Sequence, residues 1–234
     1  MSHGIHPQNA MPWTRIVPLG DLAALAYFDQ ESAALRFAAN VRRQNCPWLI
    51  DVVQAYSSVA VFFDPTRITY GGAVAALSAD DLSHGTHDEA PGRLHRVPCC
   101  YELALDLERV AEHRGLTGEE VIRLHAQTIF TIYAIGFCPG YPFLGYLPEP
   151  LCGVPRLPAP RLRVEAGTVG ITGRQSGIYT EPRPGGWNLI GRTPLQLVDV
   201  ADGYFPLRTG DRIQFEQIDL RTFKEMQGQR LPVS

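Results

Sequence analysis

A stretch dense in proline and glycine, residues 135–198, limits most strongly what this chain can fold into. Seven of the nineteen prolines lie between Pro139 and Pro160. Proline fixes φ and removes a backbone donor, whereas glycine admits positive φ, so a long helix cannot run through this stretch. The pattern predicts short strands joined by tightly specified loops. Because irregular loops inside compact domains usually carry function, we expect the functional site here.

The first third of the chain alternates between apolar runs and helical segments. β-Branched and apolar residues predict strands over residues 15–19, 22–28, 48–54 and 58–63. Helices are predicted over residues 31–43, where Leu35, Ala38 and Ala39 recur at helical spacing, and over residues 74–82. We therefore expect a small α/β sandwich domain over residues 13–92. Residues 1–12 are expected to form a mobile tail, and the polar segment 83–92 is the expected linker.

The remaining residues predict a barrel. A strand over residues 96–101 precedes a helix that Gly115 should end, and Thr117 with Glu120 matches the capping box that starts the next helix. Further short strands are predicted over residues 131–137, 167–173, 187–191, 195–200 and 212–217. Many short strands with few helices indicate a closed or nearly closed β-barrel over residues 93–219, followed by a tail over residues 220–234. The predicted fold class is α+β.

Composition excludes several classes of function. The formal net charge is −3 and no basic block is interleaved with aromatics, so nucleic acid is not an expected partner. Apolar runs fall far short of the roughly 20 residues that span a bilayer, and no signal peptide is recognised, so we expect a cytoplasmic protein without membrane contact. The five cysteines form no C-x-x-C pair, which fits reduced thiols. His84-x-x-His87-Asp88 lies in a polar loop that fixes no geometry, so no metal site is expected.

Several motifs, in this order along the sequence, carry a resemblance to a known family. They are His125, Gly136-Phe137-x-Pro139-Gly140-x-Pro142-x-Leu144, Pro155-Arg156, Pro160-Arg161-x-Arg163 and Pro184-Gly185-Gly186-Trp187-x-Leu189-Ile190-Gly191-Arg192-Thr193. With them the sequence resembles the family that includes KipI, the B subunit of bacterial 5-oxoprolinase and proteins called allophanate hydrolase subunit 1. It is also similar to subdomains C and D of the urea carboxylase carboxyltransferase domain. The resemblance covers nearly the whole chain and implies a small N-terminal α/β domain followed by a cyclophilin-like β-barrel.

The resemblance also implies a function that depends on partners. 5-Oxoprolinase is a multisubunit ATP-dependent amidohydrolase that opens the lactam of pyroglutamate to give glutamate, so the chain is expected to be a hydrolase subunit that is inactive alone. The implied partners are a carboxyltransferase A/B-type subunit, similar to allophanate hydrolase subunit 2, and a lactam-hydrolase-like subunit. The implied cofactor is ATP with Mg. Two alternatives stay open: a KipI-like protein that inhibits a sensor histidine kinase, and a component of a urea carboxylase or allophanate hydrolase system.

The chemistry of lactam opening selects the candidate site residues. No Walker A loop is present, so a nucleotide site would be completed by another subunit. Phosphate and carboxylate need cationic donors, and the arginines of the motifs offer planar bidentate ones. His125 lies on the apolar face of its helix and is either a proton shuttle, hence catalytic, or a satisfied core histidine. The residues expected to bind substrate or nucleotide are Arg156, Arg163, Gln175, Tyr179, Trp187, Arg192 and, by resemblance, Thr193.

The expected geometry is one concave site opened by the loop at residues 139–142. The helix begun at Thr117 should bring His125 within one strand of this loop, and barrel closure should bring the arginines to the same mouth. The alternative for each arginine is a surface or domain-bridging ion pair, and Trp187 is either an apolar wall or barrel core. The residues expected to shape the loops are Phe137, Pro139, Gly140, Pro142, Gly185 and Gly186.

Overall fold

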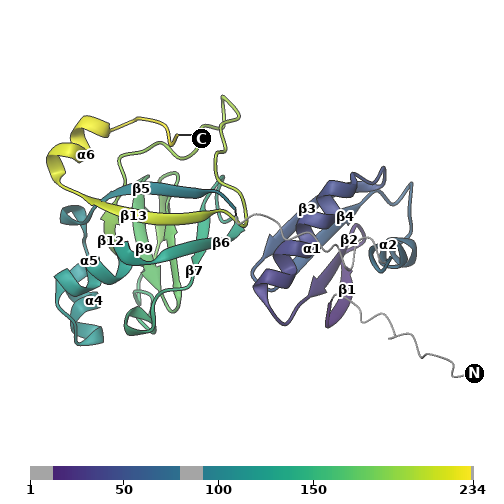
Figure 1. Cartoon of the computed structure of the whole chain (residues 1–234), viewed down its shortest axis with the longest axis horizontal. Helices are drawn as coiled ribbons and strands as arrows, with labels where there is room; N and C mark the ends of the chain where they lie inside the picture. The colour runs from purple at the N-terminus through teal and green to yellow at the C-terminus, as the bar shows by residue number, and fades with distance from the viewer. Residues whose placement is uncertain (1–12, 80–91, 233–234) are drawn as a thin grey trace, which may run out of the picture. The chain divides into compact units, whose positions relative to one another are not determined.

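The computed structural model describes residues 13–79 and 92–232 of the chain (Figure 1). The chain divides into two compact units, residues 1–90 and 91–234. Each unit has a hydrophobic core of its own. The N-terminal segment 1–12 and most of the expected linker lie outside the described residues, and with them His84 and His87.

The first unit is a four-stranded antiparallel sheet with two helices. Its strands are β1 (Arg15–Leu19), β2 (Ala23–Tyr27), β3 (Leu49–Ala55) and β4 (Ser58–Phe63), in the order β1-β2-β4-β3. Helix α1 (Glu31–Gln44) buries Phe37 and Val41 in the core of this unit. Helix α2 (Tyr70–Leu77) begins earlier than predicted, because the Thr69 hydroxyl accepts the Gly72 N–H and caps it there.

The second unit contains a closed barrel of seven strands. They are β5 (Leu94–Cys100), β6 (Ile129–Ile135), β7 (Pro142–Gly145), β9 (Thr168–Thr172), β10 (Gln175–Ile178), β12 (Asn188–Arg192) and β13 (Arg212–Ile218). The strands pair in the order β6-β13-β5-β12-β9-β10-β7, and β7 pairs again with β6, which closes the sheet. Strands β13 and β5 run parallel, whereas the other pairs are antiparallel. The predicted α+β fold, a small α/β unit followed by a β-barrel, is confirmed.

Helices and a short ribbon surround the barrel. Helix α4 (Leu107–Arg114) contacts β12 and helix α5 (Gly118–Gln127) contacts β13. Gly115, with φ of 66°, ends α4, and the predicted capping box of Thr117 and Glu120 starts α5. Strands β8 (Arg161–Val164) and β11 (Arg183–Gly185) form the ribbon, and single turns of 3-10 helix lie at η1 (Tyr101–Leu103) and η2 (Glu149–Leu151).

The strand predicted over residues 195–200 is absent. Leu195 and Leu197 are buried in the barrel core, and this burial produces the alternation that suggested a strand. The backbone makes isolated bridges instead, one of them between Gln196 and Arg230. A segment buried on one side carries the same alternation whether or not it joins a sheet.

The tail predicted over residues 220–234 is also wrong as far as the described residues reach. Helix α6 (Leu220–Met226) follows β13, and the Asp219 side chain caps it by accepting the Thr222 N–H at 2.7 Å. Phe223 and Leu231 are buried. The polar composition of the segment hid these two anchors, which pack on the barrel unit.

Candidate functional site

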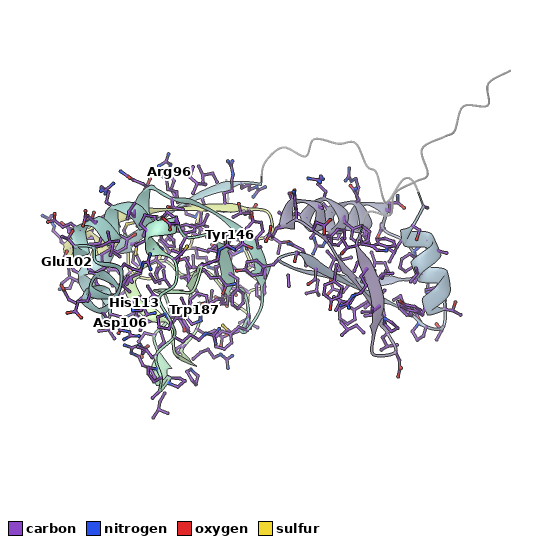
Figure 2. All side chains as sticks on the ribbon, turned by 90° about the horizontal axis from the view of Figure 1, so that it is seen from below. Arg96, Glu102, Asp106, His113, Tyr146 and Trp187 are labelled. Atoms are coloured by element: carbon purple, nitrogen blue, oxygen red, sulfur yellow. The ribbon has the colours of Figure 1, made fainter. Side chains whose placement is uncertain are left out.

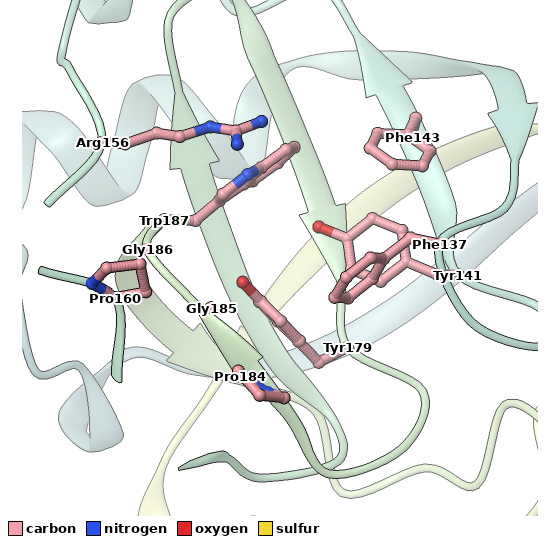
Figure 3. Close-up of a pocket in the computed structure, with 10 residues that line it drawn as sticks. All are labelled: Phe137, Tyr141, Phe143, Arg156, Pro160, Tyr179, Pro184, Gly185, Gly186 and Trp187. Atoms are coloured by element: carbon pink, nitrogen blue, oxygen red, sulfur yellow. The ribbon is translucent and has the colours of Figure 1, made fainter. Parts of the chain in front are cut away.

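A pocket opens on the barrel unit between the loop that precedes β7 and the residues that precede β12 (Figure 3). Its volume is about 300 Å³. In Figure 3, Arg156 lies on the same side of the pocket as Trp187, and three aromatic side chains lie opposite. We call it the aromatic pocket; its lining residues are Phe137, Tyr141, Phe143, Arg156, Pro160, Tyr179, Pro184, Gly185, Gly186 and Trp187.

The aromatic walls interlock edge to face. The ring centroids of Tyr141 and Tyr179 are 5.3 Å apart with planes at 89°, and those of Tyr141 and Trp187 are 6.0 Å apart at 86°. Phe143 meets Trp187 at 6.0 Å. Such pairs stabilise each other by about 0.5–1.5 kcal/mol beyond the area that they bury. The pocket is therefore held in shape by its own walls.

The loop of residues 136–141 is fixed at both ends. The Gly136 N–H donates to the Tyr141 carbonyl at 3.2 Å, and the Thr180 hydroxyl donates to the Pro139 carbonyl at 2.7 Å. Gly140 has φ of 68°, and a Cβ there would lie 2.1 Å from a Val198 methyl group, so glycine is required. The loop-shaping roles expected for Pro139 and Gly140 thus have a structural basis, and Pro142 begins β7.

Phe137, in this loop, lines the aromatic pocket in an unusual backbone conformation. Its φ is 67°, a region that residues other than glycine rarely adopt, and the residue is 61% exposed. Its ring meets Tyr141 and Tyr179 edge-on, at 5.4 Å and 6.3 Å. Backbone strain of this kind costs about 1–3 kcal/mol and concentrates at functional sites. The strained, exposed aromatic ring favours a ligand-binding role for the pocket.

A buried carboxylate holds the wall that carries Trp187. Asp106 accepts the Arg161 Nη2–H at 2.6 Å and the Leu189 N–H at 2.7 Å, and it is 6% exposed. Arg161 also donates to the Trp187 carbonyl at 3.4 Å. Asp106 therefore ties together the two segments that flank the pocket, those of Pro160 and of Trp187; Asp106 and Trp187 are labelled in Figure 2.

Tyr179 lies against a glycine that cannot be replaced without moving the ring. A Cβ on Gly185 would lie 2.1 Å from the Tyr179 hydroxyl oxygen, whereas a Cβ on Gly186 would have its nearest neighbour at 3.6 Å. Burial raises the pKa of Tyr179, and the positive charge of Arg156 acts in the opposite direction. Tyr179 is thus a neutral hydroxyl at physiological pH, and only the first glycine of the pair is sterically required.

Arg192 and Thr193 lie at a second pocket, which we call the Arg192 pocket and which has a volume of about 350 Å³. Arg192 Nε donates to the Ala166 carbonyl at 2.9 Å, and its guanidinium carbon lies 5.9 Å from the Phe223 ring centroid. Tyr179 lines both pockets. Of the predicted binding residues, Arg156 and Trp187 therefore line the aromatic pocket, Arg192 and Thr193 line the Arg192 pocket, and Tyr179 lines both.

The chain matches a known family over most of its length. Residues 14–205 match the family described as the carboxyltransferase domain, subdomain C and D. The chain belongs to this family. Among its relatives, the 5-oxoprolinase B subunit of Bacillus subtilis (strain 168) is 34% identical over 234 residues, which cover 90% of this chain and 97% of that protein. The predicted family membership is confirmed.

Solved structures resemble the chain as well. The crystal structure of TTHA0988 has a TM-score of 0.74 and 35% identity and covers 84% of this chain, but the chain spans only 40% of that protein. The urea amidolyase of K. lactis has a TM-score of 0.68 over 90% of this chain, which spans 15% of that chain. Its identity of 18% means that this likeness shows the fold alone.

His125 is a core histidine in this family member and does not reach either pocket. Its side chain is fully buried, stacked on Phe215 with ring centroids 4.6 Å apart. Both ring nitrogens are used: Nδ1 shares a hydrogen bond with the Tyr101 hydroxyl and Nε2 with the Ser176 hydroxyl, each at 2.9 Å. Burial lowers the pKa of His125 to about 3. The catalytic interpretation is corrected accordingly, since a sealed, satisfied imidazole cannot exchange protons with a substrate.

Two further candidates lie outside the pockets, so the single shared site is wrong. Arg163 is exposed on β8 and pairs with Glu165 at 2.6 Å, the surface ion pair that was the alternative. Gln175 begins β10 and lines neither pocket.

The functional residue that the sequence did not reveal is Asp106. It directly precedes α4, the position of a helix cap, yet its side chain caps nothing and reaches Arg161 and β12 instead. Tyr141 and Phe143 were also missed, although they alternate with prolines inside the loop motif. In residues 13–79 and 92–232, no cluster of His, Cys, Asp or Glu is placed to hold a metal ion, and no helix is long and apolar enough to cross a membrane.

Proposed function

We propose that this chain is the B-type subunit of a 5-oxoprolinase-like enzyme and opens the lactam of 5-oxoproline only together with partner subunits. The observation that carries the proposal is the match to the 5-oxoprolinase B subunit of Bacillus subtilis, which runs over 90% of this chain and 97% of that protein. Because fold alone does not determine function, the proposal draws on this relative and on the pockets rather than on the barrel.

The pockets support binding more than complete catalysis. The aromatic pocket presents Arg156 and the Tyr179 hydroxyl, and the Arg192 pocket presents Arg192 and Thr193. Lactam opening also needs a group that moves a proton, within hydrogen-bond reach of the reacting atoms. His125 is sealed in the core, and the residues that line the two pockets include no histidine, aspartate or glutamate. We infer that a partner subunit supplies the catalytic acid or base.

The described residues do not form a complete site for ATP with Mg. Each pocket holds a single arginine, and the described part of the chain places no acidic cluster that could hold a metal ion. ATP dependence is therefore part of the proposal through family resemblance, with a nucleotide site completed by the carboxyltransferase A/B-type partner. No step of the chemistry at the aromatic pocket is assigned to the nucleotide.

Reconstitution tests the proposed function. The purified chain is assayed for loss of 5-oxoproline and formation of glutamate, alone and with a carboxyltransferase A/B-type subunit and a lactam-hydrolase-like subunit. We expect ATP-dependent turnover in the complete mixture and none by the chain alone. Turnover by the chain alone contradicts the dependence on partners. No turnover in the complete mixture, combined with ATP-independent binding to a sensor histidine kinase, favours the KipI-like alternative.

A further inference from the structure

Arg156 is the cation of the aromatic pocket, and the described chain leaves it without a counter-charge. Neighbouring arginines are paired: Arg161 with Asp106 and Arg163 with Glu165, each at 2.6 Å. Among the described residues, no aspartate or glutamate lines the pocket and none pairs with Arg156. A guanidinium in this situation favours an anionic ligand, above all a planar carboxylate that accepts two parallel hydrogen bonds.

Tyr179 and Arg156 line the same pocket, close enough for the guanidinium charge to act on the tyrosine hydroxyl. Burial raises the pKa of the Tyr179 hydroxyl, while the charges of Arg156 and Arg161 lower it in part. In the view of Figure 3, the Arg156 guanidinium lies above the Trp187 ring and the Tyr179 hydroxyl lies below it. The pocket therefore combines a cation at one end with a neutral hydroxyl that can hydrogen-bond an amide.

The walls select a small ring. The volume of about 300 Å³ lies at the lower end of the range for small-molecule sites, about 300–1,000 Å³. The rings of Trp187, Tyr179 and Phe143 line the pocket, and edge-to-face contacts with one another or with Tyr141 hold them in place. A preformed aromatic slot of this size suits one five- or six-membered ring rather than a nucleotide or a folded peptide segment.

Phe137 provides a cover for such a ring. It lies at the pocket with φ of 67°, and the residue is 61% exposed. An exposed aromatic residue on a strained backbone persists only where the surrounding structure fixes it. A ring bound beneath Phe137 would cover part of its exposed apolar surface, and this contact would offset the strain.

We propose that the aromatic pocket binds a small cyclic carboxylate, specifically the lactam 5-oxoproline. The carboxylate pairs with Arg156, the ring packs on Trp187 beneath Phe137, and the Tyr179 hydroxyl hydrogen-bonds the lactam amide. The choice of this lactam rests on the proposed function, whereas the demand for a ring with one carboxylate rests on the pocket alone. The site thereby captures the substrate, and the partner subunit completes the chemistry.

Direct binding to the full chain, without partners or ATP, tests this inference. Isothermal titration calorimetry at ligand concentrations up to about 10 mM compares 5-oxoproline with 2-pyrrolidinone, the same lactam without its carboxylate. We expect 5-oxoproline to bind at least about tenfold more tightly, because hydrogen bonds to charged groups are the stronger ones. No binding of 5-oxoproline, or equal binding of the two lactams, overturns the inference.

Matched arginine variants locate the ligand. Arg156→Ala should weaken 5-oxoproline binding at least about tenfold, because it removes the bidentate partner of the carboxylate. Arg163→Ala removes an arginine that is also exposed but lies outside the pocket, and it should leave the affinity unchanged. Thermal melting of both variants checks that they fold. Equal losses in the two variants, or no loss in Arg156→Ala, overturn the assignment to this pocket.

The binding test and the reconstitution test can fail independently. If the complete mixture turns over 5-oxoproline but the chain does not bind it, the pocket assignment is wrong and the proposed function stands. If the chain binds 5-oxoproline through Arg156 but the complete mixture is inactive, the pocket assignment stands and the proposed function is wrong.

Discussion

The buried carboxylate of Asp106 tests how the aromatic pocket is built. Asp106→Ala removes the acceptor of Arg161 Nη2–H at 2.6 Å and of Leu189 N–H at 2.7 Å. The Arg161 side chain is 25% exposed, so water partly solvates the stranded charge. Breaking a buried pair costs about 3–5 kcal/mol, and this exposure places the loss of unfolding free energy near the lower end, about 3 kcal/mol.

Hydrogen exchange read by mass spectrometry measures this loss in the intact protein. A destabilisation of about 3 kcal/mol should speed exchange of the most protected barrel amides by roughly a hundredfold. Peptides from β3 and β4 belong to the other unit and serve as an internal control. Glu165→Ala is the matched variant, because it also removes the carboxylate of an arginine pair at 2.6 Å, but an exposed one that solvent screens.

The result that refutes this reasoning is equally specific. If Asp106→Ala leaves barrel exchange at the wild-type rate, the Trp187 wall is held by ring packing alone. If Glu165→Ala accelerates exchange as much as Asp106→Ala does, burial does not distinguish the two pairs. Acceleration in the β3 and β4 peptides would show that the effect is not confined to the barrel unit.

Other side chains make equally direct predictions. Burial lowers the pKa of His125 to about 3, so the imidazole is protonated at a higher pH in the unfolded chain than in the folded one. The free energy of unfolding should therefore fall as pH drops from about 6.5 toward 3, by up to about 1.4 kcal/mol per pH unit more than in His125→Phe. Urea denaturation at several pH values measures this slope, and equal slopes in the two proteins contradict the prediction. Gly185→Ala should displace Tyr179 and lower the melting temperature. Gly186→Ala should not, because a Cβ at this position lies 3.6 Å from its nearest neighbour. Calorimetry measures both melting temperatures, and equal shifts refute the steric argument. Phe223→Ala should lower the free energy of unfolding of the barrel unit by about 3 kcal/mol, measured by urea denaturation. No change would show that residues 220–232 do not pack on the barrel.

Sequence-local causes explain what could be predicted. The capping box at Thr117 and the positive φ of Gly115 depend on a few adjacent residues, so both helix boundaries were predicted and observed. The proline- and glycine-rich stretch, residues 135–198, marked the site region, and all ten residues that line the aromatic pocket fall within it. The strands β7, β8, β10 and β11 of this stretch were not predicted individually, because strands of three or four residues show too little periodicity.

The composition of the site depended on contacts between distant segments. Asp106 and Leu189 meet because α4 contacts β12, a pairing that no local pattern encodes. Arg156 and Arg192 reach different pockets, while Arg163 turns to Glu165 on the surface. The face of the sheet to which each side chain points depends on strand register. The bulge between Leu189 and Gly191 shifts that register within β12.

His125 separates what the sequence determined from what the tertiary structure decided. The helical spacing placed it on the apolar face of its helix, so the sequence by itself determined that it would be buried. Whether the buried imidazole would meet a substrate or be satisfied within the core depended on barrel closure, which brings Tyr101 and Ser176 to its two nitrogens. Short-range patterns determine helices, turns and which faces are apolar, because their energies depend on near neighbours. The partners of each polar group depend on the long-range pairing of strands, and only the tertiary structure decided them.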